Sequence, residues 1–142
     1  MWTIILSGIS ILVSIIALII SIIKYNQSKR YNAFNALLDI EFQLNSRKLE
    51  LDTLLKDEEK AYLNGNEDLA KILKKYSESG KENFYNTLDR LAFGILNNYL
   101  SESELEKEYR NYILETIKTS PENFNEGSPF RNIKKLNDKW QN

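Results

Sequence analysis

The chain begins with a long apolar stretch that carries one regular stripe of small and polar residues. Residues 2–23 contain no Asp, Glu, Lys or Arg, and most of them are Ile, Leu or Val. The stripe recurs at alternating intervals of four and three positions: Thr3, Ser7, Ser10, Ser14, Ala17, Ser21 and Lys24. This spacing keeps all of its members on one side of an α-helix. We call these residues the seam.

The apolar stretch has the length of a membrane span. A helix rises about 1.5 Å per residue, so roughly 20 apolar residues cross the hydrocarbon core of a bilayer. We therefore predict a transmembrane helix over residues 1–24. A cleaved signal peptide is the alternative, and it would need Lys or Arg before the stretch and a small-residue cleavage site after it. Met1 and Trp2 precede the stretch and Lys24 follows it, which favours an uncleaved anchor.

The charges that flank the span predict its orientation. Lys24, Lys29 and Arg30 follow the apolar stretch, whereas no Lys or Arg precedes it. Because basic residues are retained on the cytoplasmic side, we expect the N-terminus outside and residues 25–142 in the cytoplasm. The expected location is the inner membrane of a bacterium, crossed once.

The seam predicts self-association within the membrane. Lipid gives helices no hydrophobic reason to associate, so they pack through small residues and interhelical hydrogen bonds. The alternative is a lone anchor that tolerates serines, since a serine hydroxyl can bond the carbonyl four residues earlier. All serines of the span and its only alanine lie on the seam, which favours an oligomer. Its serines could pack dry in a small bundle, or line the polar lumen of a ring with Lys24 at the cytoplasmic mouth.

Helical periodicity continues beyond the span. The seam spacing extends to Ser28, Tyr31 and Asn35 without an intervening Gly or Pro. Apolar residues then follow at roughly helical intervals: Phe34, Leu37, Leu38, Phe42, Leu44, Leu49, Leu51, Leu54 and Leu55. This pattern predicts one long helix that ends at Asn64 and Gly65.

The remainder of the chain predicts shorter helices and no strands. We expect Asn66 to cap a helix that ends at Gly80, and Ser101 and Glu104 to form a capping box at the start of a later helix. Between them lies the expected central core helix, with Phe84, Leu88, Leu91, Ala92, Ile95, Leu96 and Tyr99 on one face. Residues 121–129 should form a loop before a last short helix. The fold class is therefore all-α, a four- to five-helix bundle behind one transmembrane helix.

Composition removes most catalytic chemistry. The 142 residues include no Cys and no His, which excludes thiol catalysis, disulfides and the commonest general base and metal ligand. A net charge of −1 argues against direct nucleic-acid binding. No phosphate-binding or dinucleotide motif occurs. We expect no enzyme activity, no catalytic residue, no metal and no cofactor.

Two charged positions stand out from the solvated faces. Asp89 and Arg90 interrupt the most apolar helix beyond the span, so we consider a buried ion pair, inside the bundle or between subunits. A position at the flank of the helix is the alternative. Arg110 and Asn111 begin a tract similar to an Arg-x4-6-His ribonuclease motif, but Glu115, Thr116 and Ile117 occupy the positions where histidine would be needed. RNA cleavage is therefore not expected.

The order of these parts resembles a known class. A first span, a long helix after it, and then the motifs Phe84-Tyr85-x-x-Leu88-Asp89-Arg90-Leu91-Ala92-x-Gly94-Ile95 and Tyr109-Arg110-Asn111-Tyr112 resemble small bacterial membrane-anchored helical proteins of phage-defence loci. The pore-forming membrane accessory proteins of type VI-B CRISPR systems are among them. The resemblance implies a homo-oligomeric antiviral effector that depolarises the membrane.

A second function class stays open beside the effector. In the effector, the partners are the lipid bilayer and further copies of the chain, and a protein or nucleotide signal is the expected trigger. The alternative is a membrane-tethered binding module, in which the span only localises a helical domain that binds a protein or a small signalling ligand.

Overall fold

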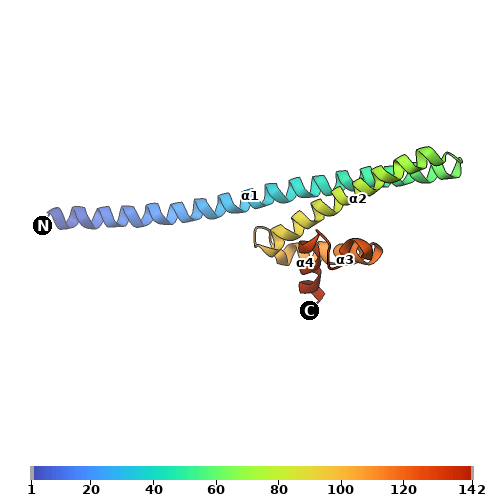
Figure 1. Cartoon of the computed structure of the whole chain (residues 1–142). Coiled ribbons are helices and arrows are strands. Elements are labelled where there is room, and N and C mark those ends of the chain that lie inside the picture. Colours follow the sequence, from blue (N-terminus) through green and yellow to red (C-terminus); the bar gives the residue numbers. More distant parts are fainter. Residues whose placement is uncertain (1, 142) are drawn as a thin grey trace. The chain divides into compact units, whose positions relative to one another are not determined.

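The structure is a computed structural model that describes the backbone of residues 2–141 and the side chains of residues 10–141. It contains four α-helices and one short 3-10 helix: α1 (Trp2–Leu63), α2 (Glu67–Leu96), α3 (Glu102–Thr119), η1 (Pro121–Phe124) and α4 (Arg131–Gln141). The described residues include no strand. The all-α prediction is confirmed (Figure 1).

The chain forms two compact units, Met1–Ala36 and Leu37–Asn142. The described residues of the first unit, 2–36, all belong to α1. The second unit contains the remaining part of α1 and all other helices. The expected boundary after residue 24 concerns the membrane edge, which is a different boundary and stays a prediction.

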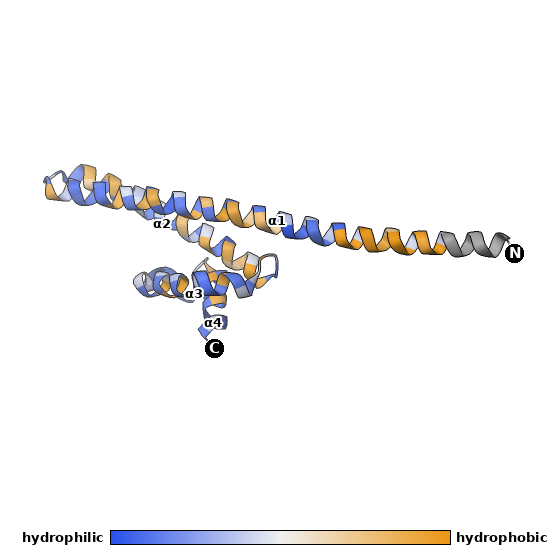
Figure 2. Ribbon diagram, turned by 180° about the vertical axis from the view of Figure 1, so that it is seen from behind, coloured by the Kyte–Doolittle hydropathy of each residue, from blue (hydrophilic) through white to orange (hydrophobic). Residues whose placement is uncertain are grey.

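Among the described residues, α1 is the one helix that is long and apolar enough to cross a membrane. None of its most apolar 18-residue window is buried in the structure. The apolar character is visible as a continuous run along α1 (Figure 2). The length and the largely apolar composition of this part of α1 would allow it to cross a membrane.

The turn between α1 and α2 is encoded locally, and its prediction is confirmed. Gly65 adopts a left-handed φ of 71°, which a glycine adopts without steric cost. The Asn66 backbone N–H donates to the carbonyl of Ala61 at 2.9 Å and closes the last turn of α1. The Asn66 side chain then accepts a hydrogen bond from the Leu69 N–H at 3.2 Å and caps α2.

The predicted helix end at Gly80 is wrong, because α2 runs through this position to Leu96. Gly80 is buried where α2 meets α1. A Cβ atom placed there would lie 3.5 Å from Cδ1 of both Leu51 and Leu54, so this glycine lies at the closest approach of the two helices. Figure 1 shows the end of α1 beside the beginning of α2.

The actual end of α2 depends on a different pair of residues. Asn98 adopts a left-handed φ of 57° after the last helical turn. The Gly94 carbonyl accepts hydrogen bonds from the N–H groups of Tyr99 and Leu100 at 2.9 and 3.1 Å. A Cβ at Gly94 would approach Cδ1 of Leu100 to 2.9 Å, so a larger residue here would require the buried Leu100 side chain to shift.

The core of the second unit is built mainly by α2, and five of the seven residues predicted for its core face are buried: Phe84, Leu88, Leu91, Ala92 and Ile95. Tyr99, also predicted there, lies after the end of α2 and is 61% exposed. The fully buried large side chains of this core come from α2, α3 and α4: Leu88, Leu91, Ile95, Ile113, Ile133 and Leu136. Tyr85, Phe124 and Phe130 form an edge-on aromatic cluster beside them, with ring centroids 5.2 to 5.8 Å apart. The last helix closes over this core, as expected.

Two other local predictions are partly right. Helix α3 begins after Ser101, as expected, but the Ser101 side chain makes no capping hydrogen bond. The segment expected to be a loop contains η1, and the buried Ser128 organises the chain after it. The Ser128 hydroxyl donates to the Asn123 carbonyl at 2.6 Å and accepts from the Phe130 N–H at 3.1 Å.

Candidate functional site

The seam is the first candidate site. Its members from Ser10 to Lys24 lie on one helix, α1, and all are exposed. The side chains of Thr3 and Ser7 lie outside the described residues. The Ser14 hydroxyl donates to the Ser10 carbonyl at 2.9 Å. That internal bond satisfies the hydroxyl proton and leaves the oxygen able to accept a hydrogen bond from another helix or from water.

The surface around the seam is uniformly aliphatic. The flanking Ile, Leu and Val side chains of residues 11–23 are between 47 and 62% exposed. Polar groups on this part of α1 are therefore confined to one stripe, and the other side presents only hydrocarbon.

Asp89 has a structural role inside one chain. Its Oδ1 atom accepts hydrogen bonds from the backbone N–H groups of Asn132 and Ile133, at 2.8 and 3.0 Å. Its Oδ2 atom accepts from the Asn132 side-chain amide at 2.6 Å. A carboxylate from α2 thus caps the first turn of α4, where negative charge is favoured by the helix dipole.

The ion pair expected inside the bundle is corrected to this helix cap. Arg90 points elsewhere: it is exposed, and its Nη1 lies 3.5 Å from Oε1 of Gln43 on α1. Asp89 is held by neutral amide groups that α4 leaves unpaired at its start, so it needs no cation within the chain. An ion pair between subunits stays a prediction.

Arg110 and Asn111 lie on the outer surface of α3. Both are exposed, and Arg110 Nη1 is 3.5 Å from a Glu106 carboxylate oxygen one turn earlier. They line a shallow hollow of about 440 Å³ together with Leu114 and Gln141. This hollow presents no nucleophile paired with a base.

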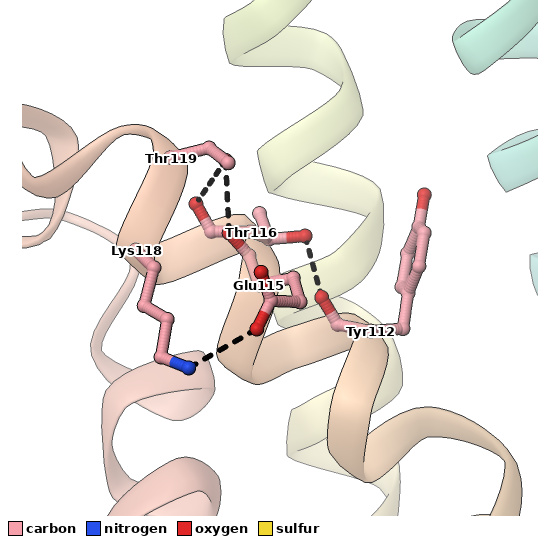
Figure 3. A network of polar contacts seen from close by, with 5 residues as sticks. All are labelled: Tyr112, Glu115, Thr116, Lys118 and Thr119. Carbon is pink, nitrogen blue, oxygen red and sulfur yellow. Dashed lines mark hydrogen bonds and ion pairs between the residues drawn. The ribbon is translucent and has the colours of Figure 1, made fainter.

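Glu115 and Thr116, at positions where the ribonuclease motif would need a histidine, make local contacts (Figure 3). Glu115 accepts from Lys118 Nζ at 3.1 Å, and the Thr116 hydroxyl donates to the Tyr112 carbonyl at 2.8 Å. The Thr119 hydroxyl donates to the carbonyls of Glu115 and Thr116. Their polar groups stabilise the end of α3.

A groove between α1 and α3 is lined by Tyr109 and Tyr112, the two tyrosines whose pKa is raised. It has a volume of about 240 Å³, and its lining includes Glu41, Lys48, Tyr109 and Tyr112. The Tyr109 hydroxyl donates to a Glu41 carboxylate oxygen at 3.1 Å. Burial, and then the Glu41 charge, raise the pKa of Tyr109 well above its ordinary value. Both effects favour the protonated phenol, which acts here as a hydrogen-bond donor and not as a base.

The second helix contact of α4 is also polar. Glu102, at the start of α3, accepts hydrogen bonds from Lys139 Nζ at 2.6 Å and from Trp140 Nε1 at 3.2 Å. The hydrogen bond from Lys139 is the main reason that the pKa of Glu102 lies below its ordinary value. Asp89 and Glu102 therefore hold α4 at both ends, from two different helices.

Sequence reasoning identified Asp89 as unusual but missed its partner, and it missed the Tyr109 contact with Glu41. An Asp within an apolar helix was the available signal for the first. The second joins positions 68 residues apart and has no local signal. Among the described residues, no three His, Cys, Asp or Glu side chains are placed to hold a metal ion.

Comparison with known proteins gives no family for the chain. No protein-family model matches it, and neither a curated protein nor a solved structure matches it.

Proposed function

We propose that this protein is a membrane-anchored, self-associating protein whose seam brings the membrane helices of several copies together. The single observation behind the proposal is the confinement of polar groups to one exposed stripe of an otherwise aliphatic helix. In lipid, such a stripe allows close backbone approach and interhelical hydrogen bonds, whereas aliphatic faces gain little from contact with one another.

The assembly acts as a pore or depolarising channel in this proposal. A ring of copies turns the hydroxyls of Ser10, Ser14 and Ser21 toward a shared lumen, which they can hydrate. Lys24 then surrounds the cytoplasmic mouth. The basic residues after the span support a cytoplasmic second unit. The antiviral role is proposed from the resemblance in layout, with a protein or nucleotide signal as trigger.

The proposal is tested by making the seam aliphatic. In the variant S10L/S14L, the span keeps its length and becomes more apolar, so it should insert normally. We expect loss of membrane depolarisation on induction, read with a potential-sensitive dye, and a smaller detergent-solubilised particle. The control I16L/I20L changes two off-seam positions and should behave as wild type. Full depolarisation by S10L/S14L, or a monomeric wild-type particle, would refute the pore.

A membrane-tethered binding module is the second candidate, and the hollow beside the aromatic cluster supports it. This hollow, of about 550 Å³, lies between α2 and the η1 region and includes Lys81, Glu82, Tyr85 and Glu122 in its lining. Replacing residues 1–24 by an unrelated single span distinguishes the two candidates. A binding module keeps its activity after this exchange, whereas a pore formed by the seam loses it.

A further inference from the structure

The part of α1 in the second unit has two apolar faces, and only one of them is covered. The covered face includes Leu44 and Ala61, which are 5 and 4% exposed. Leu51 and Leu54 on the same face meet α2 at Gly80. The other face presents Leu38, Phe42 and Leu49, which are 47, 74 and 69% exposed. We call these three residues the exposed stripe.

The fold of a single chain does not use the exposed stripe. Polar contacts of α1 with its own bundle also lie on the covered side: Glu58 accepts from Ser77 at 2.8 Å, and Glu41 accepts from Tyr109 at 3.1 Å. Three large apolar side chains in a row are thereby left in water, although a helix needs only one apolar face to pack on its bundle. Such a face indicates a contact made outside the chain.

The spacing of the exposed stripe identifies a second copy as its partner. Counting on from the seam, the alternation of four and three continues through Tyr31, Asn35, Leu38, Phe42, Asn45 and Leu49 without a shift. This 3.5-residue repeat is the pattern of helices that pair side by side, because it keeps one stripe facing a neighbouring helix over many turns. A partner of unrelated shape would not require it.

The polar members of the repeat support the same partner. Asn35 and Asn45 interrupt the apolar positions, and an Asn in such a repeat pairs best with the same residue of an identical helix. Two copies anchored in one membrane also point in the same direction, which brings equal residue numbers together. Homotypic pairing in parallel places equal asparagines opposite one another. Asn45 is exposed and lies at the edge of the groove that contains Glu41 and Tyr109.

We infer that the exposed stripe Leu38–Phe42–Leu49 pairs in parallel with the same stripe of a second copy, beyond the membrane. This inference rests on the self-association proposed above and names its second contact surface. Three side chains cover far less than the roughly 800 Å² per partner of a stable soluble complex. The pairing therefore depends on the anchor, which holds copies at high local concentration.

The chain contains no cysteine, so a disulfide-linked dimer of a single-cysteine variant can form only through the introduced residue. We would place F42C and L49C in the full-length protein in native membranes, with E50C as the exposed control one position from the stripe, and oxidise them. We expect at least fivefold more disulfide-linked dimer from F42C and L49C than from E50C. Adding F42E to L49C should return the dimer yield to the control level, because two carboxylates would face each other.

A cysteine in the seam, S14C, separates failure of this inference from failure of the proposed function. In one outcome, S14C forms the dimer but F42C and L49C form no more dimer than E50C. This outcome would refute pairing through the exposed stripe and would leave the seam as an interface. Dimer from F42C and L49C without any from S14C supports the stripe and removes the seam as an interface. Cross-linking of F42C only to other proteins would overturn the inference in favour of a different partner.

Discussion

Two stretches of α1 keep the same alternation of four and three residues with opposite chemistry. Between residues 10 and 24, the stripe is serine, alanine and lysine on an aliphatic helix. Between residues 38 and 49, it contains leucine and phenylalanine on a largely polar helix. If both stretches make helix contacts, as proposed, the solvent accounts for the inversion. Helices in lipid associate through small and polar groups, and helices in water associate through apolar ones.

The largest expected effect is on the free energy of unfolding, and it should differ between the covered face of α1 and the exposed stripe. Leu44→Ala removes a buried side chain from the covered face and should lower the free energy of unfolding by about 3 kcal/mol. Leu49→Ala, on the exposed stripe, should change it by less than about 0.5 kcal/mol. Urea unfolding of the detergent-solubilised chain, followed by circular dichroism, measures both. Equal losses would mean that the stripe is part of the bundle.

The second prediction concerns membrane insertion and the seam residue Ser14. A carboxylate at the centre of a span costs about 3 kcal/mol when it faces lipid or a dry interface. Ser14→Asp should therefore reduce the fraction of protein that resists carbonate extraction, whereas Phe42→Asp should not. Ser14→Ala is the matched control with normal insertion. Complete insertion of Ser14→Asp would place this position against water and favour a wet lumen over a dry bundle.

The third prediction concerns Asp89, which belongs neither to the seam nor to the exposed stripe, and whose loss should destabilise the bundle. Asp89→Ala leaves the first N–H groups of α4 without their acceptor and should lower the free energy of unfolding by about 2 kcal/mol. Hydrogen exchange at the Ile133 amide should rise, while dimer formation by F42C should be retained. Asn86→Ala, an exposed position of the same helix, is the control. Unchanged exchange at Ile133 would contradict the cap.

The smallest effect probes how closely the covered face of α1 approaches α2. Gly80→Ala should raise the free energy of unfolding by up to about 1 kcal/mol, since alanine is the better helix former. Its Cβ would make ordinary contacts of 3.5 Å with Leu51 and Leu54. Gly94→Ala should have the opposite sign, because its Cβ would displace the buried Leu100 side chain, whose Cδ1 and Cγ lie 2.9 and 3.2 Å away. The two melting temperatures, measured in parallel, would show whether the signs differ.

Sequence alone predicted the features that depend on neighbouring residues. The turn at Gly65 and the cap by Asn66 follow from conformational preferences within a few positions, and both are present. The all-α class and the central helix follow from periodicity. The apolar positions after the span were also recognised, but as one run: periodicity did not separate Leu44 on the covered face from Leu49 on the exposed one.

Features that depend on a distant neighbour could not be predicted in this way. A glycine within a helical pattern predicts a break, but at Gly80 the residues opposite decide, and they lie on α1. The partner of Asp89 is 43 residues further along the chain, so only the fold reveals a cap where the sequence left a buried ion pair and a position at the helix flank open. Both errors arise from reading a tertiary contact as a local signal.

The cap by Asp89 also determines how the last helix can exist. Helix α4 has 11 residues, a length at which an isolated peptide in water is mostly unfolded. Its first amides are satisfied by α2 and its far end is held by Glu102 of α3. The C-terminal segment therefore orders only once both other helices are in place. Loss of either neighbour would release it as an unstructured tail accessible to proteases, so proteolysis at this end reports on the integrity of the whole bundle.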